Sequence, residues 1–226
     1  EEKMYEYFRK FGVGQTAGVG LPYEVAGYMP ELNQWSGGTF ANLPIGQGMS
    51  MSLLQMTSIY QALANDGVRV EPRLINKITT SDGAELDSDP AKETRVVSPE
   101  TARTTVDMFR AVTQKDETGV QQGSGAPAAI DGYQVSGKTG TAQQVDPDTG
   151  AYSNSKYWIN FAGIAPADKP RFVVGIMLDD PERGTDGGAG GSAAPLFHDI
   201  MAWMLDHYNV PLSKEAGPKL MLEANQ

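Results

Sequence analysis

The chain has 226 residues, and its 18 Lys and Arg residues against 28 Asp and Glu residues give a net charge of −10. This acidic balance argues against nucleic acid as a partner and against docking on an anionic lipid surface, because both are bound by basic faces. Cysteine is absent, which excludes disulfides, thiolate metal ligands and a cysteine nucleophile. With 40% apolar residues, 26 Gly and 14 Pro, the composition indicates a turn-rich globular domain rather than a disordered chain.

The first third of the sequence predicts two helices separated by a long loop. Apolar residues recur at helical spacing over residues 4–11, and Gly12 is placed to end that helix. Residues 13–48 are rich in Gly and Pro and lack a period, so an ordered loop is expected there. Residues 49–65 show an amphipathic helical pattern, which Asp66-Gly67 stops.

The middle third predicts two short strands and one helix. The strands cover residues 73–80 and 94–97, and a polar segment without regular structure separates them. Ser98 is a suitable N-cap and Pro99 suits the first helical position, so a helix is expected from there to about residue 114.

The last third predicts three strands. The first covers residues 132–144 and is followed by a turn-rich segment, 145–156. The other two cover residues 157–165 and 171–178, and the link between them has the length of a hairpin loop. These two strands should therefore pair antiparallel.

Beyond the strands, a Gly-rich stretch at residues 184–191 is expected to be a flexible loop, and the apolar pattern over 196–204 predicts a final helix. Strands in sequence with helices on both sides of them indicate an α+β domain around an antiparallel sheet.

One stretch matches two chemical motifs at once. Gly132, Gly137, Lys138 and Thr139 match the phosphate-binding loop G-x-x-x-x-G-K-[ST]. Lys138, Thr139 and Gly140 match the K-T-G motif of penicillin-recognising enzymes. The phosphate loop requires a helix that begins at the Thr and directs its N-terminus at the phosphates, whereas K-T-G belongs on a strand that lines a cleft.

The sequence after the motif favours the strand. Residues 146–150 form a turn cluster, and no regular helix can begin at Thr139 and continue through it. The chain also offers no βαβ crossover that would build a nucleotide site. A P-loop nucleotide hydrolase, with Gly132 to Thr139 as its loop, stays open as an alternative, as does a plain polar strand with an exposed lysine.

On a strand beside a cleft, these residue types suit acyl transfer. Lys138 would place a cation near a substrate carboxylate and near the proton path of a nucleophile. The hydroxyls of Thr139 and Thr141 can bind that carboxylate, and the backbone N–H of Thr141 can donate to a developing oxyanion. Gly140 would keep the strand face open for an acyl chain. The catalytic candidates are Lys138 and Thr141, and the substrate-binding candidates on the same strand are Ser136, Gly137, Thr139 and Gly140.

The sequence provides no nucleophile for this chemistry. Ser153 and Lys156 have Ser-x-x-Lys spacing, but chance alone explains the match, and the pair lies in a hairpin loop rather than at the start of a helix. His198 and His207, the two histidines, are nine residues apart in the last helix, so they face opposite sides and a Ser-His-Asp triad is not expected. We expect neither a metal ion nor a cofactor.

Four segments, taken in order, resemble class B penicillin-binding proteins. They are the region of the long central helix at 41–75, the K-T-G strand VSGKTGTAQQ at 135–144, the next two strands at 157–181 and the C-terminal helix at 190–213. The last segment resembles the septal, cell-division type and looks most like its actinobacterial branch. The likeness covers essentially the whole chain, which would make residues 1–226 the C-terminal part of one transpeptidase domain.

The resemblance implies the penicillin-binding/β-lactamase-like transpeptidase fold and the function of a peptidoglycan D,D-transpeptidase in septal cell-wall synthesis. Such an enzyme acylates a serine with the penultimate D-Ala of a stem peptide and passes the acyl group to an amine of a neighbouring stem, and β-lactams block it covalently. The resemblance also implies that the loop from Ile45 to Met49, with Gln47, forms part of the cleft wall.

The family's Ser-x-x-Lys and Ser-x-Asn motifs lie N-terminal to the matching segments. We therefore expect the nucleophile on a preceding part of the same protein, and this chain alone to be inactive. The implied partners are peptidoglycan stem peptides, β-lactams, that N-terminal part and proteins of the divisome. The implied location is the extracytoplasmic face of the cell membrane, with an anchor helix outside this chain. A non-catalytic penicillin-binding-like scaffold that kept the fold is a second alternative.

Overall fold

The computed structural model describes residues 1–87, 90–115, 122–182, 188 and 190–213. Its central element is an antiparallel sheet of three strands in the order β5 (Ser136–Val145), β6 (Tyr152–Ala165) and β7 (Phe172–Asp179). The register pairs Lys138 with Ala162, and Ala162 in turn with Gly175. The antiparallel pairing of the last two strands confirms the prediction from their short link.

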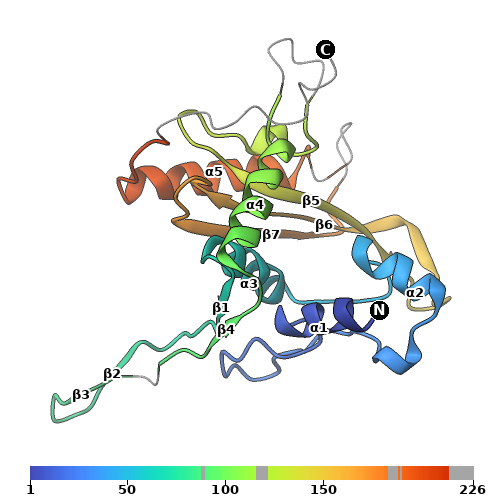
Figure 1. Cartoon of the computed structure of the whole chain (residues 1–226), viewed down its shortest axis with the longest axis horizontal. Helices are drawn as coiled ribbons and strands as arrows, with labels where there is room; N and C mark the ends of the chain where they lie inside the picture. Colours follow the sequence, from blue (N-terminus) through green and yellow to red (C-terminus); the bar gives the residue numbers. More distant parts are fainter. Residues whose placement is uncertain (88–89, 116–121, 183–187, 189, 214–226) are drawn as a thin grey trace.

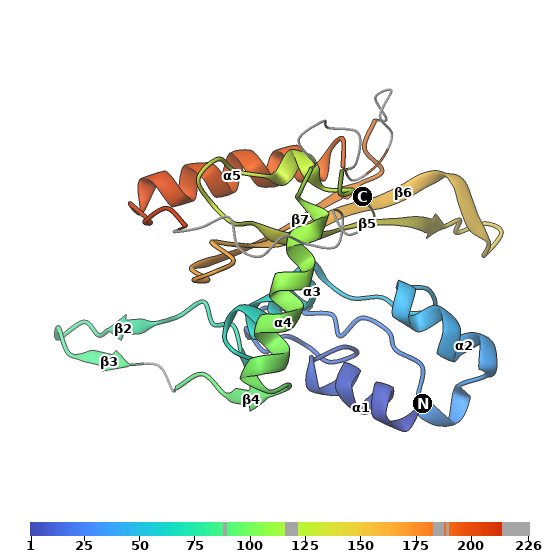
Figure 2. The same cartoon turned by 45° about the horizontal axis from the view of Figure 1, so that its top comes forward.

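Helices cover both faces of this sheet (Figures 1 and 2). One face packs against α5 (Ala193–His207), and the other packs against α3 (Leu53–Ala64) and α4 (Pro99–Phe109). A sheet that is apolar on both faces needs a helical layer on each, and this layering confirms the expected α+β class.

Alternate side chains of β6 anchor the two helical layers. Phe161 on β6 and Phe197 on α5 are fully buried, with their ring centroids 4.8 Å apart. Met201 and Leu205 extend this apolar cluster along α5 at intervals of about one turn. Ile164 lies on the opposite face of β6 and belongs to a second cluster with residues of α3 and α4.

The N-terminal segment folds on the α3 side of the sheet (Figure 2). A buried side chain of α3 organises it: the amide Nε2 of Gln55 donates to the carbonyls of Gln15 and Ala26 at 2.6 and 2.9 Å. The segment contains α1 (Glu2–Lys10), η1 (Leu32–Gln34), α2 (Gly37–Asn42) and η2 (Leu43–Ile45). The loop expected over residues 13–48 is therefore ordered, but the prediction missed its short helices.

Capping side chains fix where the two long helices before the sheet begin. Ser52 and Gln55 exchange hydrogen bonds in a capping box, which starts α3 at Leu53 rather than at the predicted residue 49. Ser98 accepts a hydrogen bond from the backbone N–H of Thr101 at 3.1 Å, which confirms the predicted cap of α4. The turn η3 (Arg110–Val112) follows α4 directly.

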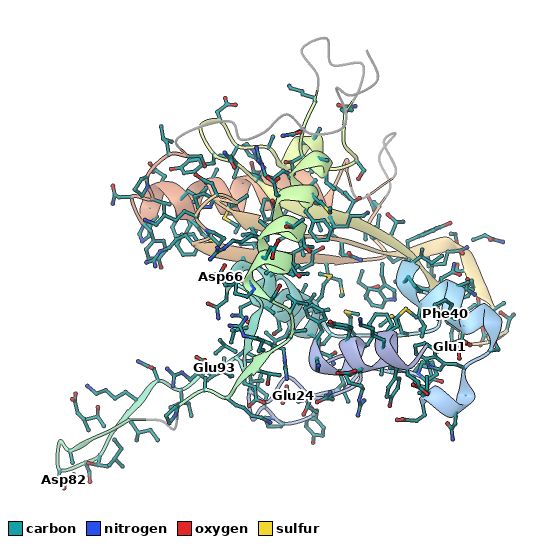
Figure 3. All side chains as sticks on the ribbon, viewed as in Figure 1. Glu1, Glu24, Phe40, Asp66, Asp82 and Glu93 are labelled. Carbon is teal, nitrogen blue, oxygen red and sulfur yellow. The ribbon has the colours of Figure 1, made fainter. Side chains whose placement is uncertain are left out.

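The middle region contains more strands than predicted. The first, β1 (Val68–Val70), was not expected and pairs with β4 (Glu93–Arg95). The next, β2 (Lys77–Thr79), is shorter than predicted and pairs with β3 (Glu85–Asp87), which lies in the segment expected to be irregular. Three-residue strands carry too few positions for a periodic signal. The β2–β3 hairpin projects from the body of the molecule, and Asp82 marks its tip (Figure 3).

Element boundaries in the last third also differ from the prediction. β5 begins at Ser136 because Gly132 has a φ of +80° and lies in a turn, and η4 (Ala126–Ala128) precedes that turn. β6 begins at Tyr152, so Ser153 and Lys156 lie on a strand instead of in a loop. Most of the stretch 184–191 lies outside the described residues. Within the described ranges, no helix combines the length and apolar character needed to cross a bilayer.

The packing of α5 generates a stability prediction. Phe197→Ala should lower the free energy of unfolding by about 3–5 kcal/mol, because it leaves a cavity against Phe161. Trp203→Ala is a control on the same helix: Trp203 is 61% exposed and stacks on the neighbouring His207 ring, so its loss should lower stability clearly less than the loss of Phe197. Denaturant unfolding of the complete protein measures both, and equal effects would contradict this packing.

An ion pair between the end of α3 and α4 generates a pH prediction. The Asp66 carboxylate accepts from Arg103 Nε and Nη2 at 2.8 and 2.9 Å, and these hydrogen bonds lower the pKa of Asp66. Because the pKa of Asp66 is lower in the folded state, the ion pair stabilises the fold at pH values above the ordinary pKa of Asp. This stabilisation is lost as the pH falls through the folded-state pKa. Arg103→Gln should therefore raise the pKa of Asp66 in an NMR titration, and Lys169→Gln should not. An unchanged value in the first variant would refute the pairing.

Candidate active site

The Lys-Thr-Gly triplet lies on β5, at the edge of the described sheet. Residues Ser136 to Gln143 pair one by one with β6, from Ile164 back to Tyr157. Among the strands of the described residues, only β6 pairs with β5. The outer edge of β5 therefore carries backbone N–H and C=O groups that an extended ligand can use.

The chain after the triplet continues as a strand, which contradicts the phosphate-loop alternative. β5 runs to Val145 and ends in a turn that Asp146 holds: its Oδ1 accepts from the backbone N–H groups of Asp148 and Thr149 at 3.0 and 2.9 Å. These hydrogen bonds lower the pKa of Asp146, and the one from the Thr149 backbone has the largest effect. Because no helix begins at Thr139, there is no helix N-terminus to hold phosphates.

The Lys138 side chain is exposed on this edge. Its Nζ donates to the backbone carbonyl of Thr139 at 2.9 Å. The salt bridges between described residues do not include Lys138. The ammonium therefore lies along the outer side of the strand without a carboxylate partner in the described part of the chain, where it can meet an anionic ligand.

The sheet register shows which way the backbone of Thr141 points. The Tyr157 carbonyl on β6 accepts from Asp180 on the β7 side, so Asn160, three positions further, directs its N–H and C=O to β5. Its partner Gly140 therefore faces β6, and the adjacent Thr139 carbonyl, which accepts a hydrogen bond from Lys138 Nζ, is directed away from β6. In an antiparallel strand the N–H and C=O of one residue point to the same side, and alternate residues share that side. The N–H of Thr141 is therefore directed outward as well, into position to donate to a ligand oxygen.

Thr139 has a side-chain partner that sequence reasoning missed. The Ser124 hydroxyl lies 2.7 Å from the Thr139 hydroxyl. The flanking glycines permit this approach: a Cβ on Gly123 would lie 2.2 Å from the Val112 carbonyl oxygen, and one on Gly125 would lie 2.7 Å from the Phe161 ring. The Gly-Ser-Gly run was the available signal, and it places a hydroxyl where it orients Thr139.

Ser136 does not lie on the ligand side, contrary to the expectation that it binds substrate. Its side chain is fully buried, and its hydroxyl donates to the backbone carbonyl of Val106 on α4. A buried hydroxyl with its own acceptor is satisfied within the fold. Ser136 thus fixes the start of β5 to α4, on the inner side of the strand away from solvent.

The two glycines of the motif region make room for β6 rather than for a ligand. A Cβ on Gly137 would lie 2.5 Å from the Phe161 ring, and a Cβ on Gly140 would lie 2.2 Å from Asn160 Oδ1. The expectation that Gly140 leaves an open strand face is therefore wrong, because Asn160 occupies that space. Asn160 is directly opposite Gly140 in the register and was not predicted from the sequence.

Gln47 is not brought to the triplet by any contact between described residues. It lies exposed in the turn after η2, where its backbone N–H donates to the Asn42 carbonyl at 3.1 Å.

Ser153 and Lys156 lie at the start of β6 instead of one helical turn apart, so they lack the geometry of a nucleophile pair. Within the described ranges, no three His, Asp or Glu side chains gather in a way that could hold a metal ion.

Comparison with known proteins gives a consistent set of relatives. Residues 1–202 match the penicillin binding protein transpeptidase domain. Penicillin-binding protein PbpB of Mycolicibacterium smegmatis is 57% identical over 223 residues, which are 99% of this chain and 34% of that protein. Peptidoglycan D,D-transpeptidase FtsI of Escherichia coli K12 is 33% identical over 224 residues, 99% of this chain and 35% of that protein.

Solved structures agree with the sequence relatives. The crystal structure of penicillin binding protein 3 from Mycobacterium tuberculosis in complex with ampicillin superposes with a TM-score of 0.92 and 57% identity. The superposition covers 98% of this chain and 49% of that one. The chain thus spans roughly a third of the curated relatives' length and half of the crystallised chain. Because the family match extends over residues 1–202, the chain belongs to the penicillin-binding protein transpeptidase domain family.

Proposed function

We propose that this chain supplies the K-T-G side of the active site of a septal peptidoglycan D,D-transpeptidase. The observation that carries the proposal is the outer edge of β5, where the Lys138 ammonium has no carboxylate partner among the described residues and the Thr141 N–H is directed outward. Family membership supports it, since a relative 33% identical to this chain is a peptidoglycan D,D-transpeptidase.

In the proposed reaction, a serine hydroxyl from another part of the protein attacks the carbonyl carbon of the penultimate D-Ala of a stem peptide. The amide bond to the terminal D-Ala breaks, its nitrogen takes up the proton that the serine loses, and free D-Ala leaves. The amine of a second stem then attacks the serine ester, forms the new amide and returns the proton to the serine oxygen. Neither step needs a redox partner or a metal ion for its balance.

Three residues along the outer edge of β5 have roles in this reaction. The Lys138 ammonium and the Thr139 hydroxyl attract the terminal carboxylate of the stem peptide. The Thr141 N–H donates to the carbonyl oxygen that becomes negative when the serine attacks. Because this hydrogen bond is stronger in the transition state than in the bound substrate, it lowers the barrier of the reaction. Ser124 holds the Thr139 hydroxyl in place, and Gly137 and Gly140 keep β5 close to β6.

The proposal extends to ligands, partners and location. A relative has been crystallised with ampicillin and with aztreonam, which supports β-lactams as covalent inhibitors of this protein. The septal type implies assembly with divisome proteins at the extracytoplasmic face of the membrane. The loop around Gln47 remains a predicted part of the cleft wall.

Covalent labelling tests the proposed function. A fluorescent penicillin should label the complete protein, in which the nucleophilic serine accompanies β5, and it should not label residues 1–226 by themselves. Detection is by in-gel fluorescence, with an excess of unlabelled ampicillin as the competitor. A complete, folded protein that takes up no label would instead indicate a scaffold without catalysis.

The role of Lys138 has its own test. In the complete protein, Lys138→Ala should lower the rate of penicillin acylation by about 100-fold or more, because it removes the cation that faces the carboxylate and the proton path. Lys156→Ala, an exposed lysine at the start of β6, is the matched control and should leave the rate unchanged. Thermal unfolding should be similar in both variants. Equal acylation rates would remove Lys138 from the site.

A further inference from the structure

A second cationic site lies away from β5, where α1 meets the ladder of β1 and β4 (Figure 1). A cavity of about 470 Å³ opens there, and its lining comes from these elements and the residues beside them. Basic side chains dominate the lining, with Arg9, Lys10, Arg69 and Lys92 against one carboxylate, that of Glu6. The chain as a whole has a net charge of −10, so the charge of this lining is opposite in sign to the overall charge.

Arg69 is the buried member of this group. The residue is 9% exposed, and its Nε is buried without a hydrogen-bond partner among the described residues. The guanidinium packs against the turn after α1, since a Cβ on Gly12 would lie 3.0 Å from Arg69 Nη1. A buried guanidinium stays charged, and an unpaired one is costly unless an anion compensates it. The described residues supply no such anion.

The nearby carboxylates neutralise only part of this charge. Glu6 pairs with Lys10 at 2.6 Å, and Glu71 lies 3.7 Å from Lys92. The Glu31 carboxylate accepts from the hydroxyl of the lining residue Tyr5, so Arg9 and Arg69 are the cations without a carboxylate partner among the described residues. Arg9 donates only to a neutral acceptor, the Gly14 carbonyl, at 3.2 Å. Glu93 lies on β4 beside the lining residue Thr94 (Figure 3), and the alternation of a strand turns its side chain to the other face.

A neutral donor completes the set. Thr94 is directly opposite Arg69 in the β1–β4 register, so its hydroxyl lies on the same face of the ladder. A planar guanidinium, a hydroxyl and flexible ammonium groups around one cavity match an oxyanion that offers several acceptor oxygens and more than one negative charge.

We propose that this cavity binds a phosphate group, either as free phosphate or as a phosphate monoester. A phosphate dianion offsets more of the surplus charge than a single carboxylate does, and its oxygens can accept from Arg69, Thr94 and Lys92 together. No lining residue lies on β5, so the site and its test are independent of the proposed transpeptidase function.

Calorimetric titration of the complete protein at constant ionic strength tests the proposal. Inorganic phosphate should bind saturably, and Arg69→Gln should weaken binding about tenfold or more, the effect of losing one hydrogen-bonded charge. Lys92→Gln should weaken it as well, and this exposed position tolerates substitution even if the Arg69 variant does not fold. Lys169→Gln, an exposed lysine outside the cavity, is the matched control and should bind as the unaltered protein does.

The other arms separate the ligand classes. Glycerol phosphate that binds more tightly than inorganic phosphate would identify a monoester as the ligand, and equal binding would identify the free anion. Malonate that binds as tightly as phosphate would overturn the assignment to phosphate. Absence of saturable binding would overturn it too, for example because a carboxylate from another part of the complete protein already pairs with Arg69. If Lys169→Gln weakened binding as much as Arg69→Gln does, phosphate would be responding to the overall charge of the protein and not to this cavity, which would overturn the proposal.

Discussion

The pairing of β5 with β6 positions the groups that the outer edge of β5 presents to a ligand. It holds β5 from one side, while the Ser136 hydroxyl fixes the strand to α4 and the Phe161 ring fills the space beneath Gly137. Asn160 occupies the space that a Cβ on Gly140 would need. A strand held at these points presents its outer edge in a fixed position. Such a preorganised edge is what acyl-transfer chemistry requires of its donors.

Local charge, rather than the charge of the whole molecule, determines what this edge can bind. The chain carries a net charge of −10, which would repel an anionic stem peptide at long range. Charges beyond about 8–10 Å are largely screened at physiological ionic strength, so the groups next to the ligand dominate. At β5 these include the Lys138 ammonium and the outward N–H groups, which are donors suited to an anionic group. The cavity around Arg69 follows the same principle on a different face.

Sequence reasoning succeeded where a local signal exists and failed where a contact spans the fold. The cap at Ser98 and the strand through Lys138 were predictable, because a capping residue and a following turn are encoded within a few positions. Ser124 and Asn160 were not, since their importance comes from partners that only the folded sheet brings near. The prediction that Ser136 binds substrate was wrong because the burial of β5 does not alternate regularly along the strand. The alternation of side chains between the two faces therefore does not tell which of them face solvent.

A crystal structure of the complete protein acylated by ampicillin would test whether the outer edge of β5 binds the ligand. The acyl carbonyl oxygen should lie within hydrogen-bond distance of the Thr141 N–H, the carboxylate of the drug should contact Lys138 and Thr139, and β5 should keep its present register with β6. An adduct that lies away from the outer edge of β5, or a shift of the β5 register, would show that this edge is not the binding surface.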